Sequence, residues 1–487
     1  MRTTSLTSTL STPSPALQLI AHSAKLRMVL AMAICFVCGY SSLLAQTDYA
    51  TPYAFTTLAG SHGNSGVTNG TGSAALFSDP RGVALDGSGN IYVADPFNIR
   101  KITPGGVVTT FAGPIPPFTT NPAGYADGTG SAAQFDQTYG VAIDHAGNLY
   151  VSDGAADTIR KITPGAVVST LAGSFTNQGS SDGTGSAASF YSPAGLTVDG
   201  GGNIYVADSQ NSTIRKITPG GLVTTLAGSA GHTGSTDGSG SAARFFYPND
   251  VTLDGSGNLL VADTGNNTIR KVTPSGVVTT VTGQPGVSGP YGGVTDGSLS
   301  NALFNQPLGV AVDSRGNIYV AEPYVIRQIT PGGIVTTLAG NTQNSAAADG
   351  TGSTAIFNKP WSLAVDGSGN IYVADQNDYT IRKGSLVGDA FGGTIAGVNL
   401  NYSSWFSYYT TASYPLIYEY YLGYQYVYPA GSGVNLYDYG SGHFWYTQAS
   451  YFPFIYDYSL GAFLYYYQAN TPHRHFYDFA TSQVITE

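Results

Sequence analysis

Between residues 54 and 383 the chain alternates short apolar runs, rich in valine, isoleucine and tyrosine, with polar turns. Such runs favour β-strands over helices. They recur as one unit, present six times at a period of 53 to 59 residues. A fixed period of this length is typical of repeat architectures. The segment GVALDGSGNIYVAD at 82–95 returns, with variations, at 140–153, 195–208, 250–263, 309–322 and 362–375.

Each unit predicts four strands: one ending at the first Asp of the segment, then IYVAD, TIRKIT and VVTTLAG or their variants. The connections are turn sequences. Asp-Gly-Ser-Gly-Asn joins the first two strands and Thr-Pro-Gly-Gly joins the last two, since glycine accepts positive φ and Asp and Asn bond the local backbone. Four-stranded sheets repeated around an axis are propeller blades.

The closure of the ring is also readable in the sequence. After Lys383 the sixth unit continues without a VVTTLAG strand, whereas AFTTLAG at 54–60 is a fourth strand with no unit of its own. We therefore expect the segment at 54–60 to complete the last blade, which gives six blades closed by the N-terminal strand.

The units resemble the NHL repeat, whose pattern is Asn/Pro-x-Gly, Val-Ala-Val-Asp, then x-x-Gly-Asn-Ile-Tyr-Val-Ala-Asp and a following Arg. The resemblance covers residues 54 to 383, and the DGTGSAAxF segments are similar to those of secreted bacterial members. It implies an all-β, six-bladed NHL propeller. Departures from the pattern are Glu322, Leu260, Asp250 and Ser362.

Residues 1–45 are predicted to be a signal peptide. Arg2, Lys25 and Arg27 precede an apolar stretch from Met28 to Leu44, followed by a small residue suited to cleavage. The alternative is an uncleaved membrane anchor, for which this stretch is slightly short. Both cysteines, Cys35 and Cys38, lie inside the stretch. The mature chain would therefore contain no disulfide and no thiol chemistry.

The negative net charge of the chain argues against some classes of binding partner. The formal net charge is −10, and loss of the three N-terminal cations would take it to about −13, which gives no electrostatic reason to bind nucleic acid or anionic lipid. We expect a monomer that is secreted or located in the periplasm or at the cell surface. After cleavage it would have no stable membrane insertion.

Candidate ligand-binding residues occur just before or at the start of the first strand of each unit, nearest the central channel. The loops between strands two and three differ among the copies, and variable loops on a rigid frame are where recognition is usually placed. The alternative is that these residues only pack or face solvent. The candidates for the channel mouth are Arg81, Tyr139, Asn249, Asp250 and Trp361.

Other recurring residues are interpreted as structural. The acid ending each second strand precedes an arginine by five to seven residues, as Asp208 precedes Arg215, which predicts an ion pair or loop cap within each blade. The Asp-Gly-Thr-Gly segments, such as the one starting at Asp127, could be calcium loops or Asx-type turns. The turn is favoured because each segment offers one carboxylate, whereas calcium takes six to eight oxygen ligands.

An enzyme is the rival interpretation, because relatives of this fold include metal-dependent lyases and lactonases. A catalytic zinc site needs three convergent ligands, but the units contain only His62, His145 and His232, in positions not expected to converge. No nucleophile motif or phosphate loop is present. We therefore expect no catalytic residue, no metal and no cofactor.

Residues 398–487 are predicted to be a separate domain, because they hold 20 of the 35 tyrosines. YPLIYEYYLGYQYVY at 414–428 aligns with FPFIYDYSLGAFLYY at 452–466, a pattern similar to aromatic hairpin repeats at the C-termini of other secreted bacterial proteins. Trp405, Trp445 and Tyr446 are candidates for stacking on glycans. The alternative is that the rings only form a core.

The sequence thus predicts a propeller at 46–397 that acts as a binding scaffold for a protein, peptide or glycan ligand. Behind it, an aromatic module at 398–487 would serve surface or carbohydrate attachment. A purely structural component of the cell envelope is a further alternative.

Overall fold

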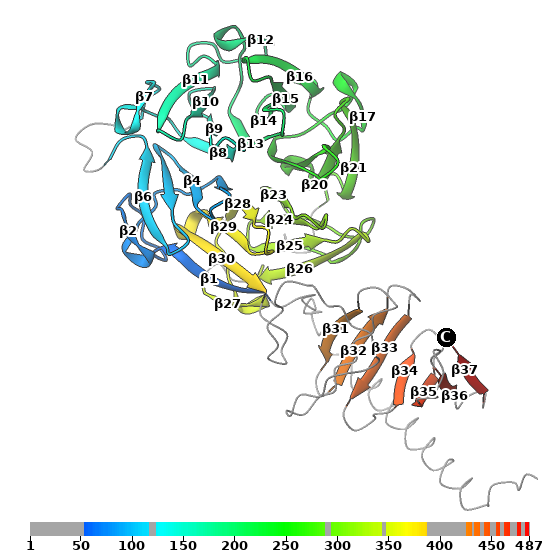
Figure 1. Ribbon diagram of the computed structural model, residues 1–487. Coiled ribbons are helices and arrows are strands. Elements are labelled where there is room, and N and C mark those ends of the chain that lie inside the picture. Colours follow the sequence, from blue (N-terminus) through cyan, green and yellow to red (C-terminus); the bar gives the residue numbers. More distant parts are fainter. Residues whose placement is uncertain are drawn as a thin grey trace, which may run out of the picture. The chain divides into compact units, whose positions relative to one another are not determined.

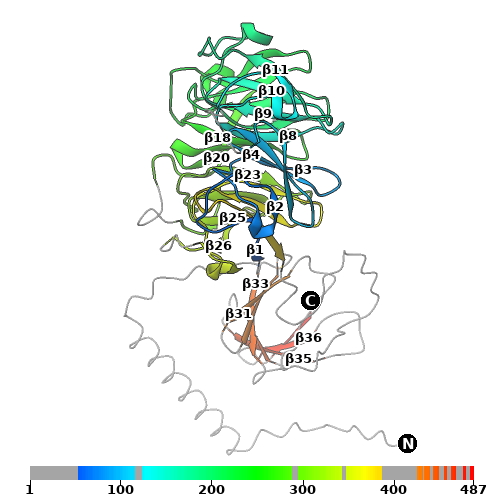
Figure 2. The same cartoon turned by 90° about the vertical axis from the view of Figure 1, so that its left-hand side faces the viewer.

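The computed structural model describes residues 53–115, 123–287, 294–342 and 347–386, together with the backbone of seven short strands between residues 425 and 486. The predicted signal peptide at 1–45 lies outside the described residues. The first four ranges form six antiparallel sheets arranged around a common axis (Figure 1). Figure 2 shows the same blades from the side. The predicted six-bladed propeller is confirmed.

The innermost strand of each blade contacts the innermost strands of its two neighbours, and the sixth contacts the first, so the ring is complete. In order of the blades these strands are β3 (Val83–Leu85), β8 (Thr138–Ile143), β13 (Pro193–Val198), β18 (Pro248–Leu253), β23 (Gly309–Val312) and β28 (Pro360–Val365).

The second and third strands form the buried middle of each blade, and their apolar residues pack between neighbouring sheets. The second strands are β4 (Ile91–Asp95), β9 (Leu149–Asp153), β14 (Ile204–Asp208), β19 (Leu259–Asp263), β24 (Ile318–Glu322) and β29 (Ile371–Asp375). The third strands are β5 (Asn98–Ile102), β10 (Thr158–Ile162), β15 (Thr213–Ile217), β20 (Thr268–Val272), β25 (Val325–Ile329) and β30 (Thr380–Leu386).

The fourth strand of the sixth blade comes from the N-terminal end of the described chain. Five blades use their own fourth strands, which are β6 (Val107–Ala112), β11 (Val167–Gly173), β16 (Leu222–Gly228), β21 (Val277–Gly283) and β26 (Ile334–Gly340). In the sixth, β1 (Tyr53–Gly60) pairs antiparallel with β30, with Thr56 opposite Lys383. Figure 1 shows the blue β1 beside the yellow β30. The predicted closure is confirmed.

Each sheet has five strands, not the four that the sequence pattern predicts. The additional strand has two residues and belongs to the connector leading into the blade, where it pairs with the fourth strand and covers part of an otherwise open sheet edge. These strands are β2 (Gly70–Thr71), β7 (Gly128–Thr129), β12 (Gly183–Thr184), β17 (Gly238–Ser239), β22 (Gly297–Ser298) and β27 (Gly350–Thr351).

In five blades a one-turn 3-10 helix follows the two-residue strand directly. In the first four blades its first residue donates its backbone N–H to the turn between the third and fourth strands, as Gly72 does to the Gly106 carbonyl at 3.0 Å. The middle of the connector therefore lies beside the turn between the third and fourth strands. It does not stay at the end of the blade where the loops between the second and third strands lie. These helices are η1 (Gly72–Ala74), η2 (Gly130–Ala132), η3 (Gly185–Ala187), η4 (Gly240–Ala242) and η7 (Gly352–Thr354), and two others, η5 (Thr264–Asn266) and η8 (Gln376–Asp378), lie between second and third strands.

A fully buried arginine fastens each connector to its blade. In the third blade, Arg215 pairs with Asp208 at 2.8 Å and with Asp182 of the connector at 2.9 Å. Its remaining contacts are two connector carbonyls and the ring of Phe190. The predicted ion pair is present in all six blades. The Asp-Gly-Thr-Gly aspartates serve as partners of these arginines rather than as turn caps. The equivalent arginines are Arg100, Arg160, Arg270, Arg327 and Arg382.

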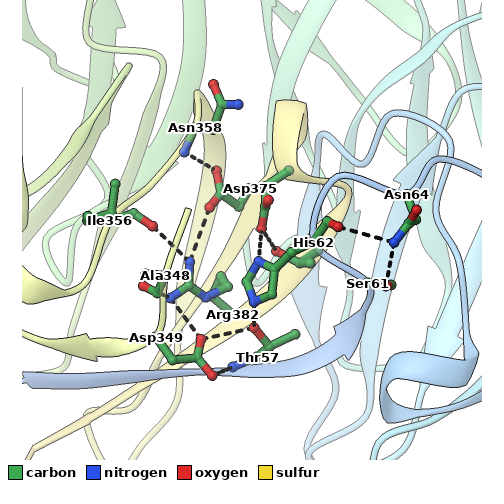
Figure 3. A network of polar contacts seen from close by, with 12 residues as sticks. Thr57, Ser61, His62, Asn64, Ala348, Asp349, Ile356, Asn358, Asp375 and Arg382 are labelled. Carbon is green, nitrogen blue, oxygen red and sulfur yellow. Dashed lines mark hydrogen bonds and ion pairs between the residues drawn. The ribbon is translucent and has the colours of Figure 1, made fainter. Parts of the chain in front are cut away.

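A polar network joins β1 to the sixth blade (Figure 3). Thr57 donates its backbone N–H and its hydroxyl to the carboxylate of Asp349, which also pairs with Arg382. His62, just after β1, contacts the Thr57 hydroxyl through Nε2 at 2.9 Å and Asp378 through Nδ1 at 2.5 Å. Backbone pairing and side-chain contacts therefore hold β1 in the sixth blade.

The backbone of the C-terminal strands forms one antiparallel sheet in which each strand pairs with the next along the chain. Residues 387–424 and the turns between the strands lie outside the described residues. The aromatic hairpin module thus stays a prediction. The strands are β31 (Gln425–Ala430), β32 (Gly433–Asp438), β33 (His443–Gln448), β34 (Phe454–Asp457), β35 (Ala462–Tyr467), β36 (His475–Asp478) and β37 (Gln483–Thr486).

Candidate functional site

The inner strands approach one another closely around the axis. A Cβ placed on Gly82 would lie 2.7 Å from the carbonyl oxygen of Tyr139 in the next blade, and one placed on Gly309 would lie 2.7 Å from Cα of Ser362. Real Cβ atoms do not tolerate such distances, so these two positions, in the first and fifth blades, require glycine. The equivalent positions in the fourth and sixth blades are Asp250 and Ser362, which are also the two departures from the Gly of the repeat.

Three of the five predicted channel residues come together at one end of the axis. The guanidinium carbon of Arg81 lies 4.2 Å from the ring centroid of Tyr139 and 5.4 Å from that of Trp361. The two rings are stacked, with centroids 6.1 Å apart and planes inclined by 25°. The residues come from the first, second and sixth blades, because the ring closure makes these blades neighbours.

Asp79 and Lys359 complete this group, which we call the axial cluster: Asp79, Arg81, Tyr139, Lys359 and Trp361. Asp79 forms an ion pair with Arg81, with 2.6 Å between Oδ2 of Asp79 and Nη2 of Arg81. The Lys359 ammonium lies 4.9 Å from the Trp361 ring centroid. Burial and the nearby positive charge of Arg81 lower the pKa of Lys359, although Asp79 acts in the opposite direction. Two cations thus face one carboxylate.

Lys359 was missed by the sequence reasoning. It stands two residues before Trp361, at a backbone φ of 62°, outside the first-strand segment used to select candidates. Equivalent positions in other blades also have positive φ, including Gln137 and Tyr247. The signal available in the sequence was the Phe-x-x-Pro/Thr pattern that precedes most inner strands, which gives each blade one further side chain at the same end of the axis.

A glycine in the neighbouring loop makes room for the Tyr139 ring. Gly154 lies between the second and third strands of the same blade, and a Cβ added there would overlap Cδ2 and Cε2 of that ring. The loop that contains Gly154 and the side chain of Arg81 therefore together fix the position of the Tyr139 ring. In the second blade, the loop between the second and third strands therefore bears directly on the candidate site.

Asn249 and Asp250 lie on the opposite side of the ring and bond to the protein itself. Asn249 donates its side-chain amide to the carbonyl of Leu308 at 2.7 Å. Asp250 is buried and accepts the backbone N–H groups of Val251 and Val310. Burial raises the pKa of Asp250 to about 7, although these N–H groups and the Ser362 side chain act to lower it. Neither residue contributes to the axial cluster.

The candidates for glycan stacking belong to the C-terminal part of the chain. Trp405 lies outside the described residues. Trp445 and Tyr446 lie on β33, where Trp445 is opposite Leu436 of β32 and Tyr446 is opposite Asn435.

Within the described part of the chain, no group of three or more His, Cys, Asp or Glu residues is arranged to hold a metal ion. His62 contacts Thr57 and Asp378, and His232 contacts its own connector. The same residues include no helix long and apolar enough to cross a membrane.

Comparison with known proteins identifies the repeat. The model of the NHL repeat matches residues 190–217, 245–272 and 357–383. Human NHL repeat-containing protein 2 is 31% identical over 293 residues, which cover 53% of this chain and 39% of that protein. Mouse teneurin-4 is 27% identical over 344 residues, covering 62% of this chain but 12% of teneurin-4. The chain therefore contains NHL repeats and spans less than half of these relatives.

Solved structures share the fold. A protein of unknown function from Bacteroides thetaiotaomicron aligns with a TM-score of 0.52 at 21% identity, covering 69% of this chain and 76% of that one. A structure described as an auxiliary nutrient binding protein from the same organism gives a TM-score of 0.51 at 14% identity, covering 71% and 78%. At these identities the likeness establishes the propeller fold alone.

Proposed function

We propose that this chain of NHL repeats is an extracytoplasmic binding scaffold whose axial cluster recognises a protein, peptide or glycan ligand. The observation that carries the proposal is the meeting of Arg81, Tyr139 and Trp361 from three blades. Arginine and large aromatic residues are enriched where binding energy is concentrated. None of the three is part of the recurring arginine–acid pairs that hold the blades together.

The scaffold role is consistent with how the blades are built. Buried ion pairs recur in every blade, whereas the axial cluster occurs once and breaks the sixfold pattern. An auxiliary nutrient binding protein is among the propellers with which the chain shares its fold. The aromatic module at 398–487 would provide surface or carbohydrate attachment.

An enzyme is the rival proposal. A lyase or lactonase of the metal-dependent kind would need a resident ion, so metal analysis of the purified protein separates the two. A stoichiometric, tightly held ion would favour the enzyme.

Binding is tested with the purified protein immobilised and exposed to a native envelope fraction. We expect Trp361→Ala to weaken binding about thirtyfold or more, since loss of a central aromatic residue costs at least about 2 kcal/mol at a binding hot spot. Phe175→Ala is the matched control, because Phe175 is a half-exposed ring on the connector between the second and third blades and is not part of the axial cluster. Equal retention by the wild type and Trp361→Ala would contradict the proposal.

The same assay tests the C-terminal module. Deletion of residues 398–487 should weaken retention on cell-wall or polysaccharide resin while leaving the effect of Trp361→Ala unchanged. Full retention after the deletion would remove the attachment role.

A further inference from the structure

The axial cluster carries more positive charge than its own carboxylate balances. Arg81 and Lys359 face Asp79 alone, and within the described residues Lys359 forms no ion pair. This local excess occurs in a chain whose formal net charge is −10. A positive site on an acidic protein favours an anionic group that approaches within a Debye length, about 8 Å at physiological salt.

Arg81 also has unused hydrogen-bonding capacity. Asp79 takes Nη2, whereas Nε and Nη1 are buried and have no hydrogen-bond partner within the described part of the chain. A buried N–H group without an acceptor is unfavourable, and more so when the group is charged. The side chain is therefore poised to gain from an oxygen acceptor that enters the cluster.

The aromatic rings determine what can accompany that acceptor. The guanidinium carbon of Arg81 lies near both rings, 4.2 Å from the centroid of Tyr139 and 5.4 Å from that of Trp361, and such apolar neighbours strengthen the pairing of a guanidinium with an anion. The Trp361 ring is partly exposed, so it can also contact the C–H face of a ring-shaped ligand.

We propose that the axial cluster binds the carboxylate of a hexuronate sugar, with Arg81 and Lys359 pairing with the carboxylate and Trp361 stacking on the pyranose ring. The inference rests on the proposed binding function and names its ligand class. In a hexuronate the carboxylate is attached directly to the rigid pyranose ring. The two groups are therefore as close together as the cations and the aromatic ring of the axial cluster that would bind them. An acidic peptide side chain carries its carboxylate on flexible methylenes instead. The negative net charge disfavours a dense polyanion, so the fitting ligand is a short chain with one such group.

The test is an equilibrium titration of the full-length protein with galacturonic acid, with galactose as the neutral probe. We expect galacturonate to bind at least about tenfold more tightly than galactose, and Arg81→Gln to remove that preference, because a charge-assisted hydrogen bond is worth about 1.5–3 kcal/mol. Lys359→Asn is the second variant, since asparagine accepts the positive φ at this position. Arg244→Gln, which removes a cation from the fourth-blade connector, is the matched control and should bind like the wild type.

Equal affinity for the acid and the neutral sugar would overturn the inference, as would unchanged galacturonate binding in both variants with intact thermal melting. Binding of acetyl-aspartate in place of galacturonate would overturn the sugar assignment. If galacturonate does not bind while Trp361→Ala still abolishes retention of envelope material, the ligand class is wrong and the binding function stands. If neither effect is seen, both proposals fail.

Discussion

At the scale of single residues, Asp250 is the exception to the pattern of buried acids. The acids that end the second strands are each paired with an arginine, whereas Asp250 is held by two backbone N–H groups. Burial raises its pKa from 3.8 to about 7. Such a group stabilises the fold fully below its unfolded-state pKa, and the stabilisation is lost as the pH rises through about 7.

Replacing Asp250 by asparagine should therefore remove a pH-dependent penalty. Between about pH 5 and about pH 8 the free energy of unfolding of Asp250→Asn should rise relative to the wild type by about 3 kcal/mol, because about two pH units of titration fall inside this window at about 1.4 kcal/mol each. Chemical denaturation at both pH values measures this difference. Val251 and Val310 donate to different oxygens of the Asp250 carboxylate, so asparagine keeps one of these two hydrogen bonds. The loss of the other is a cost that does not change with pH, so the pH-dependent difference still reports on the carboxyl group.

Asp254→Asn is the control on the same blade. Despite some burial, hydrogen bonds from Asn258 and Ser256 lower the pKa of Asp254, so its carboxylate is ionised throughout this pH range in both the folded and the unfolded chain. Its effect on stability should not change between the two pH values. A constant effect of Asp250→Asn would show that Asp250 is not the titrating group.

The repeat places Arg81, Tyr139 and Trp361 nearest the axis, and in the structure these three side chains lie close together. Their role in binding stays a prediction. Asn249 and Asp250 were selected on the same ground, but their contacts are made within the ring itself. Which side chain bonds to the backbone of the next blade depends on distances between blades, and a repeat pattern in one chain does not contain them.

At the scale of elements, the connector is the part least visible in the sequence. Its two-residue strands consist of glycine followed by threonine or serine, which have no apolar alternation to detect. The four longer strands of each blade were predictable because β-branched runs and turn residues mark their ends. The aspartate of each connector, such as Asp182, pairs with the buried arginine of its blade. This pairing depends on the three-dimensional position of the arginine, which the connector sequence does not indicate.

Arg215 provides the test of how connectors are fastened. Arg215→Met would leave Asp208 buried without its cation and free Asp182, so we expect a loss of about 3–5 kcal/mol in the free energy of unfolding. Lys216→Met is the neighbouring control, because Lys216 only lies over the ring of Tyr205 at the surface of the blade, and such contacts contribute about 1 kcal/mol or less. The two variants are compared by their midpoints of chemical denaturation. Similar midpoints would mean that the connector does not depend on this ion pair.

At the scale of the whole molecule, ring closure and the axial cluster are physically linked. The cluster takes Lys359 and Trp361 from the sixth blade and Asp79 and Arg81 from the first. β1 is the element that completes the sixth blade and leads directly into the first. Opening the ring at this junction would separate the two cations from each other. The binding proposal therefore requires that β1 occupy its place in the sixth blade.

The most direct test is a cross-link between the two ends of the propeller. Thr56 and Lys383 are opposite each other in β1 and β30, so Thr56→Cys combined with Lys383→Cys should form an intramolecular disulfide on oxidation of the folded protein. Thr56→Cys with Lys101→Cys is the matched control, because Lys101 is the equivalent lysine of the first blade and pairs with Thr109 instead. The account predicts a cross-link in the first pair and none in the second, measured by mass spectrometry of the monomer. Absence of the first cross-link, or equal formation of both, would contradict a ring closed by its own N-terminal strand.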